Sequence, residues 1–168
     1  MYLIQCPSTT MIDLDCASEE QLIAEFKDEY GSEIIFLGGG ITSCPEWQPI
    51  VIDALKDMRC VLINPRRKEW DINDKTLERK QIEWEHYHLE NCMSIIFWFP
   101  KETLCPITLF ELGKSLNKGY KLYIGCHPEY ARRNDVKIQV ELEDSNQIIH
   151  DSLEDLISEI RLDLIEKI

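Results

Sequence analysis

The sequence lacks the features that define several classes of protein. No apolar run approaches the roughly 18 residues of a membrane-spanning helix, and the N-terminus lacks the basic-then-apolar order of a signal peptide. Basic residues are scarce: 18 lysines and arginines stand against 31 aspartates and glutamates, which gives a formal net charge of −13. An acidic surface repels both a nucleic-acid backbone and an anionic membrane. We therefore expect neither as a partner.

The seven cysteines lack the spacing of a disulfide framework or a zinc site. They are scattered singly, without a CxxC pair, and their number is odd, which favours a reducing compartment. His86 and His88 are two residues apart and point to different sides of a helix, so they do not match metal-ligand spacing. The sequence predicts free thiols, a cytoplasmic location, no metal and no cofactor.

The residues that are present alternate between strand and helix patterns. A chain of 168 residues that is 44% hydrophobic fits one globular domain with a real core. Residues 94–99 are predicted to form a central strand, because every residue after Ser94 is apolar, as in strands that are covered on both faces. Further strands are expected at residues 2–6, 10–14, 33–37, 60–63, 121–124 and 136–142. The pattern predicts a three-layer α/β fold, flavodoxin-like or Rossmann-like, with a doubly wound, mostly parallel sheet of about five core strands.

Helices fill the intervals between these strands. Residues 18–21 have the pattern of a capping box, and helices are expected at residues 47–58 and 76–91, after Pro106, and after a cap at residues 151–154. Gly113 would let its helix approach the sheet closely. We treat residues 1–32 as an N-terminal extension and residues 143–168 as a C-terminal helical segment of the single domain 1–168.

Glu111 is the first candidate for chemistry. It lies in a helix that follows the best candidate for a central strand, and ligands of open α/β sheets bind at the carboxyl ends of the strands. The positive end of that helix would keep the carboxylate ionised. An anionic carboxylate beside a pocket can act as a nucleophile.

Glu85 is the second candidate. It lies one turn before Leu89 on the apolar side of its predicted helix, together with Ile82. Burying a carboxylate there costs free energy unless it has a bonding partner or a functional role. An exposed position at the rim of the helix face is an equally simple explanation. Two carboxylates that face one crevice are typical of glycosidic-bond chemistry.

Other segments offer weaker signals. The turn Gly38-Gly39-Gly40 would allow a phosphate or a sugar to approach the backbone, but a simple turn explains it equally well. Arg66 and Arg67 follow a strand end and would bind a 5′-phosphate in a fork geometry, or would be solvated loop charges. Cys105 fits a buried or pocket-lining thiol better than a nucleophile. Two placements are open for Trp47, Trp70 and Trp98: an aromatic wall for the base, or positions in the hydrophobic core.

Five short segments, taken in order, resemble one family. They are FLGGG at residues 36–40, NPRR at 64–67, QIEWE at 81–85, IIFWFP at 95–100 and PITLFELG at 106–113. With Gly125 and residues 127–135, the similarity covers residues 33–142. The set resembles the nucleoside 2-deoxyribosyltransferase-like superfamily, especially the branch with a tryptophan-glutamate pair before the central strand and an ELG helix start.

The resemblance implies roles for individual positions. Glu111 corresponds to the nucleophilic glutamate, and Glu85 to a second acidic residue that is often aspartate in relatives. Cys105 occupies a position where many relatives carry an aspartate that meets the nucleobase, so this chain departs from the pattern there. The expected substrate-binding residues are Gly39, Gly40, Ile41, Thr42, Trp47, Arg66, Arg67, Cys105 and Thr108.

The implied activity is chemistry at the N-glycosidic bond of a (deoxy)nucleoside or nucleotide. Glu111 would form a glycosyl-enzyme intermediate, and Glu85 would hold a sugar hydroxyl or protonate the base. Base exchange and base-releasing hydrolysis both remain open, and the family resemblance predicts a homo-oligomer. The alternatives are a non-catalytic nucleotide-binding sensor or regulator on the same fold, and an interaction protein that uses its terminal helix.

Overall fold

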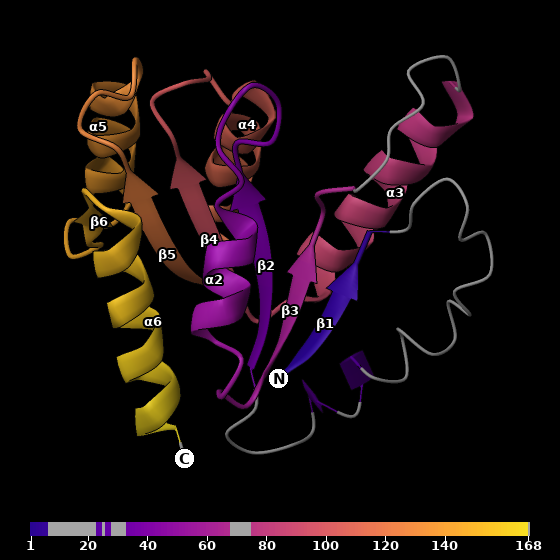
Figure 1. Cartoon of the computed structure of the whole chain (residues 1–168). Helices are drawn as coiled ribbons and strands as arrows, with labels where there is room; N and C mark the ends of the chain where they lie inside the picture. Colours follow the sequence, from indigo (N-terminus) through magenta and orange to yellow (C-terminus); the bar gives the residue numbers. More distant parts are fainter. Residues whose placement is uncertain (7–22, 25, 28–32, 68–74, 168) are drawn as a thin grey trace.

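The computed structural model describes residues 1–6, 23–24, 26–27, 33–67 and 75–167 of the chain (Figure 1). The elements in these residues form a central sheet with helices on both faces. In chain order they are β1 (Tyr2–Gln5), β2 (Glu33–Gly39), α2 (Gln48–Ala54), β3 (Cys60–Asn64), α3 (Lys75–Asn91), β4 (Ser94–Phe99), α4 (Pro106–Ser115), β5 (Lys121–Cys126), α5 (Arg133–Glu143), β6 (Ile149–His150) and α6 (Leu153–Glu166). The predicted three-layer α/β fold is confirmed.

The sheet is parallel throughout, with the strand order β1-β3-β2-β4-β5-β6. If β2 is counted as the first strand, the five strands β2 to β6 have the order 2-1-3-4-5 of flavodoxin-like folds. Strand β1 is an additional edge strand beside β3. The order reverses between β2 and β4, because the chain passes from β2 to β3 on one side and then to β4 on the other. The prediction of about five core strands agrees with this sheet, whose sixth strand, β6, is only two residues long.

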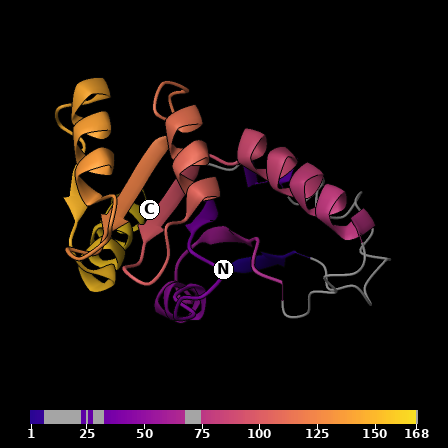
Figure 2. The same ribbon diagram turned by 90° about the horizontal axis from the view of Figure 1, so that it is seen from above.

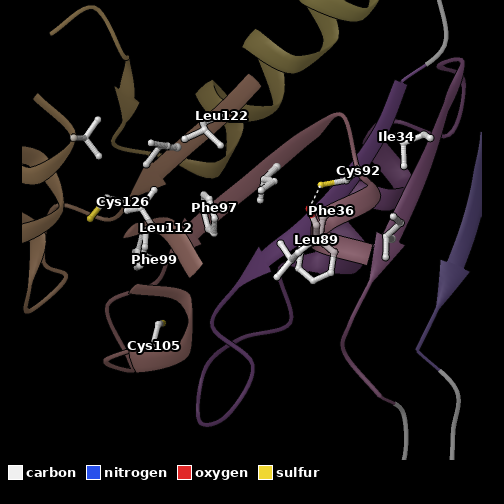
Figure 3. Close-up of a cluster of buried hydrophobic side chains, with 14 of the residues drawn as sticks. Ile34, Phe36, Leu89, Cys92, Phe97, Phe99, Cys105, Leu112, Leu122 and Cys126 are labelled. Atoms are coloured by element: carbon white, nitrogen blue, oxygen red, sulfur yellow. Dashed lines mark hydrogen bonds between the residues drawn. The ribbon is translucent and has the colours of Figure 1, made fainter. Parts of the chain in front are cut away.

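The central strands are apolar because both of their faces are covered. Every residue of β3 and β4 is buried, as expected for a parallel sheet between two helical layers. Alternate residues of β2 enter different cores: Ile34 and Phe36 pack in one cluster, and Ile35 and Leu37 in the other. The first cluster (Figure 3) includes residues of α3, α4 and α5, and the second includes residues of α2 and α6. Figure 2 shows these helices on the two faces of the sheet.

The predicted strand at residues 136–142 is wrong, because this segment belongs to helix α5. Val136 and Val140 are buried against the sheet, whereas Ile138 and Leu142 are 55% and 75% exposed. A spacing of four residues is two strand periods and also about one helical turn. The apolar alternation therefore fitted both periods, and packing on the sheet decided in favour of the helix.

Gly113 does not bring α4 close to the sheet, contrary to the sequence prediction. It lies on the exposed side of α4, and a Cβ atom built there meets no atom within 4 Å. Leu112, the residue before it, is 3% exposed and supplies the packing on the sheet side. The helix predicted at residues 47–58 is also shorter than expected, since α2 ends at Ala54.

Other predictions about the chain have mixed outcomes. The terminal helix is confirmed, and Ser152 caps it by accepting a hydrogen bond of 3.1 Å from the backbone N–H of Asp155. The six cysteines within the described ranges are free thiols, as predicted. Residues 10–14, 18–21 and 68–74, with the predictions made for them, lie outside the described residues. None of the helices in the described part of the chain has the length and apolar character needed to cross a membrane.

Candidate active site

A cavity of about 760 Å³ lies at the carboxyl ends of the central strands, where the strand order reverses. Open α/β sheets bind ligands at such a switch point, because the loops after two neighbouring strands run in opposite directions and leave a crevice between them. The cavity is lined by Phe36, Gly38, Gly39, Gly40, Ile41, Thr42, Glu46, Pro65, Arg66, Arg67, Gln81, Glu85, Thr103, Cys105, Pro106, Ile107, Thr108 and Glu111. The predicted catalytic residues and every member of the expected substrate-binding set except Trp47 therefore lie at the cavity.

Glu111 reaches the cavity from α4. Pro106 begins this helix, where its missing N–H costs no hydrogen bond, and Glu111 is the sixth residue counted from it. The side chain is half-buried, and desolvation raises the pKa of its carboxyl to about 8, with a further upward contribution from the charge of Glu85. The expectation that the helix end keeps Glu111 ionised is thus wrong. The dipole acts mainly within the first turn, and Glu111 lies beyond it.

Glu85 reaches the same cavity from α3. Its side chain is half-buried, and desolvation raises the pKa of its carboxyl. A hydrogen bond from Gln81 and the positive charge of Arg67 oppose this rise by favouring the ionised form. Because Glu85 has these partners and Glu111 has burial and a like charge, the two environments favour a proton on Glu111 and a charge on Glu85.

Gln81 is a site residue that the sequence reasoning missed. Its Nε2 donates to the backbone oxygen of Pro65 at 3.0 Å and to Oε1 of Glu85. Its Oε1 accepts from Nε of Arg67 and, at 2.9 Å, from Sγ of Cys6. This buried amide therefore connects the residue after β1, the loop after β3 and the carboxylate of Glu85. Its position four residues before Glu85, on the same helix face, was the available signal.

The glycine turn after β2 forms another wall of the cavity. Trp47 does not line the cavity: it is 2% exposed, and its Nε1 donates to the backbone oxygen of Gly40 at 2.9 Å. Trp98 is also a core residue, in the same cluster as Trp47. The two tryptophans therefore support the turn from beneath, and Trp70 lies outside the described residues.

Replacing Gly39 by alanine is expected to destabilise the protein. A Cβ atom at Gly39 would lie 2.6 Å from Cζ2 of Trp47 and 2.7 Å from the backbone oxygen of Trp98. Overpacking of this kind lowers the free energy of unfolding by about 1–3 kcal/mol. Each kcal/mol is expected to lower Tm by about 2–4 °C. Thermal denaturation measures the change. The matched control is Gly113→Ala, which adds the same methyl group in open space and is expected to leave Tm unchanged or raise it. A Gly39→Ala variant as stable as Gly113→Ala would contradict the close packing.

Cys105 and Thr108 lie at the start of α4, on the side of the cavity near Glu111. Cys105 has a left-handed backbone (φ 45°, ψ 53°), which is uncommon for a residue other than glycine. Burial raises the pKa of its thiol to about 12, so it presents a neutral sulfur, in agreement with the predicted pocket-lining thiol. The loop before it is anchored by Tyr130, whose hydroxyl donates to the backbone oxygen of Leu104 at 2.7 Å.

The part of the chain that builds the cavity is similar to a known protein family. Within the described residues, no group of three or more histidine, cysteine, aspartate or glutamate side chains is arranged to hold a metal ion. A family profile described as "Nucleoside 2-deoxyribosyltransferase like" matches residues 32–130, more than half of the chain. No curated protein matches the chain. The matched segment runs from β2 through α4 and β5 to Tyr130, and it includes all residues that line the cavity.

Proposed function

The chain belongs to the nucleoside 2-deoxyribosyltransferase-like family, and on that premise we propose that it breaks the N-glycosidic bond of a (deoxy)nucleoside or nucleotide. In this proposal Glu111 is the nucleophile and Glu85 is the second catalytic carboxylate. The observation that carries the proposal is that both side chains line one cavity at the carboxyl ends of the strands. Such a pair of carboxylates around one sugar is the usual arrangement for glycosidic-bond chemistry.

The charge state of the pair fits the first chemical step. With the pKa of Glu111 raised to about 8, the two carboxyls carry about one proton between them at neutral pH. When substrate binds, the proton passes from Glu111 to Glu85, and the carboxylate of Glu111 attacks C1′ of the sugar. The C1′–N bond breaks with its electron pair passing to the base nitrogen, and Glu85 delivers one proton to the leaving base. An ionised carboxylate beneath the ring stabilises the oxocarbenium-like transition state.

The second step returns the enzyme to its starting state. A second nucleobase or a water molecule attacks C1′ of the glycosyl ester and releases Glu111. Glu85 accepts the proton that the attacking group loses, so the pair again carries one proton. Two inversions at C1′ give net retention of configuration. The neutral thiol of Cys105 at the cavity wall is a weaker partner for a nucleobase than a carboxylate, which leaves water as a competent acceptor.

An assay for base release tests the proposed function. The protein is incubated separately with deoxynucleosides, ribonucleosides, their 5′-monophosphates and NAD, with and without a second free base, and the products are separated by chromatography. Free base without an acceptor indicates hydrolysis, and a new nucleoside indicates transfer. Binding without any product would overturn the proposal in favour of a nucleotide-binding sensor.

The pH dependence of kcat/KM tests the shared proton. The active form carries one proton on the pair, so kcat/KM is expected to fall as the pH rises through about 8, where Glu111 loses the last proton in the unliganded enzyme. It is also expected to fall at acidic pH, where both carboxyls are protonated. A profile that rises through pH 8 and stays high would show instead that the fully ionised pair is the reactive form, and that Glu85 does not supply the proton.

A further inference from the structure

The buried amide of Gln81 has a partner for each of its donor and acceptor positions. A primary amide offers two N–H donors and two lone pairs on its oxygen. Nε2 of Gln81 donates to the backbone oxygen of Pro65 at 3.0 Å and to Oε1 of Glu85. Oε1 of Gln81 accepts from Sγ of Cys6 at 2.9 Å and from Nε of Arg67. The residue is 9% exposed, and its hydrogen-bonding capacity is fully used inside the protein.

Two of these partners determine which way the amide points. The backbone oxygen of Pro65 can only accept a hydrogen bond, and the guanidinium of Arg67 can only donate one. A half-turn of the amide would place oxygen against oxygen at Pro65 and N–H against N–H at Arg67. Nε2 of Gln81 is therefore the atom that faces Glu85, and Oε1 of Glu85 meets an N–H donor whether or not that carboxyl is ionised.

The turn that orients the amide is itself held by side chains of β1 and β3. Asn64, the last residue of β3, is 5% exposed, and its Oδ1 accepts a hydrogen bond of 3.1 Å from the backbone N–H of Arg66. Its Nδ2 donates to Oε1 of Gln5 at 3.1 Å, and Nε2 of Gln5 donates to the backbone oxygen of Arg66. The orientation of Gln81 is thus anchored to two strands of the sheet.

The hydrogen bond from Gln81 makes the two oxygens of Glu85 unequal. In a protonated carboxyl the carbonyl oxygen is the better acceptor, so an N–H donor at Oε1 favours the proton on Oε2. Oε2 of Glu85 makes no hydrogen bond within the part of the chain that the structure describes, and it is not sealed in the interior. Because Glu85 lines the cavity, Oε2 is the oxygen that is open to a substrate there.

We propose that Gln81 is a positioning residue, which occupies Oε1 of Glu85 so that Oε2 carries the proton that is transferred in the reaction. The inference rests on the proposed function and specifies the atom through which Glu85 acts. The proton passes from Glu111 to Oε2 of Glu85 and then to the nitrogen of the leaving base. Glu85 is left ionised, with Oε1 still bonded to Gln81, and Oε2 takes up the proton that the attacking group loses in the second step.

The test measures kcat and KM of Gln81→Met with the best nucleoside or nucleotide substrate and with a 4-nitrophenyl 2-deoxyriboside, whose leaving group needs no proton. Methionine has a similar length and lacks the N–H donor. With the first substrate, kcat is expected to fall by about 10- to 100-fold, the effect of a lost hydrogen bond to a charged group, while KM changes by less than about threefold. With the nitrophenyl substrate, kcat is expected to stay within about threefold of wild type.

The matched control is Gln139→Met. It makes the same chemical change at an exposed glutamine of α5 that does not line the cavity, and it is expected to leave the rates with both substrates unchanged. If Gln81→Met does not fold, Gln81→Glu takes its place, because it keeps an acceptor for Cys6 and Arg67 and replaces the N–H donor by an oxygen. Its loss of kcat with the nucleoside or nucleotide is expected to be at least as large.

The pH profile provides a readout that a merely structural amide would not move. The hydrogen bond from Gln81 lowers the pKa of Glu85, and the charges of Arg67, on the turn after β3, and of Glu111, on α4, act on the same pair. Loss of the donor raises the pKa of Glu85, so the acidic limb of kcat/KM is expected to move to higher pH in Gln81→Met. An NMR titration of the carboxyl carbon of Glu85, identified by its absence in Glu85→Gln, is expected to show the same rise without substrate.

The possible failures of the two proposals are distinguishable. An equal loss of kcat with both substrates, or an acidic limb that does not move, would overturn the role of Gln81 and leave the proposed function intact. Absence of base release from every substrate of wild type would overturn the proposed function. A raised pKa of Glu85 in Gln81→Met would in that case still support the fixed position of the proton, and an unchanged pKa would overturn it as well.

Discussion

Replacing Glu111 by glutamine is expected to lower base release by about 10³-fold or more, because an amide cannot form the ester with C1′. The side chains are nearly isosteric, so the cavity keeps its shape. The measurement is kcat/KM for the best substrate of the wild type, followed by chromatography of the released base. A glycosyl adduct on Glu111, trapped with a slow substrate and located by mass spectrometry, would identify the attacking atom directly.

The matched control for Glu111→Gln is Glu83→Gln. Glu83 is an exposed glutamate of α3 whose Oε1 pairs with Nε of Arg79 at 2.7 Å, and it does not line the cavity. Its replacement makes the same chemical change from a carboxyl to an amide and is expected to leave kcat/KM within about threefold of wild type, since exposed ion pairs contribute little. A Glu111→Gln variant with activity close to that of Glu83→Gln would exclude Glu111 as the nucleophile.

The same variant has a second, independent consequence for stability. The pKa of Glu111 is about 8 in the folded protein against 4.5 for an ordinary glutamate, so the fold favours the protonated form. Wild type therefore loses stability as the pH rises from about 4.5 to 8, and the loss is complete above pH 8. Glu111→Gln carries no such charge and is expected to be more stable above pH 8 by about 1–3 kcal/mol. Urea denaturation at pH 5 and at pH 8.5 measures the difference, which is expected to be small at pH 5.

Replacing Glu85 by glutamine is expected to lower kcat/KM for natural substrates by about 10²–10³-fold, the range of general acid–base catalysis. The loss is expected to be much smaller for a 4-nitrophenyl 2-deoxyriboside, whose leaving group departs without a proton. Steady-state rates for both substrates in wild type and variant measure the difference. This comparison separates proton transfer to the base from a role in holding the sugar, because loss of a sugar contact would affect both substrates alike.

Glu85→Asp is the companion variant for this second prediction. It keeps the carboxylate but shortens its reach and moves it away from the hydrogen bond with Gln81. We expect activity between those of wild type and Glu85→Gln, with an alkaline limb still present in the pH profile. If Glu85→Gln retained full activity on both substrates, Glu85 would be a cavity wall residue without a chemical role.

Much of the fold follows from local patterns in the sequence. Residues 95–99 are apolar at every position, as in strands that are covered on both faces, and with Ser94 they form β4 in the interior of the sheet. The helix that carries Glu85 and the helix that begins at Pro106 were both predicted from spacing. The family resemblance, added to this order of elements, predicted that Glu85 and Glu111 face one crevice, and both residues line the same cavity.

Tertiary structure decided what local patterns leave ambiguous or do not encode. The alternation at residues 136–142 fits both a strand and a helix, and only its packing against the sheet made it α5. The proton on Glu111 depends on burial and on the charge of Glu85, from a helix far away in sequence. The amide network of Gln5, Asn64 and Gln81 likewise joins residues from three elements. The sequence thus determined the elements and the chemical groups, whereas desolvation and long-range contacts, which exist only in the folded chain, determined their charge and orientation.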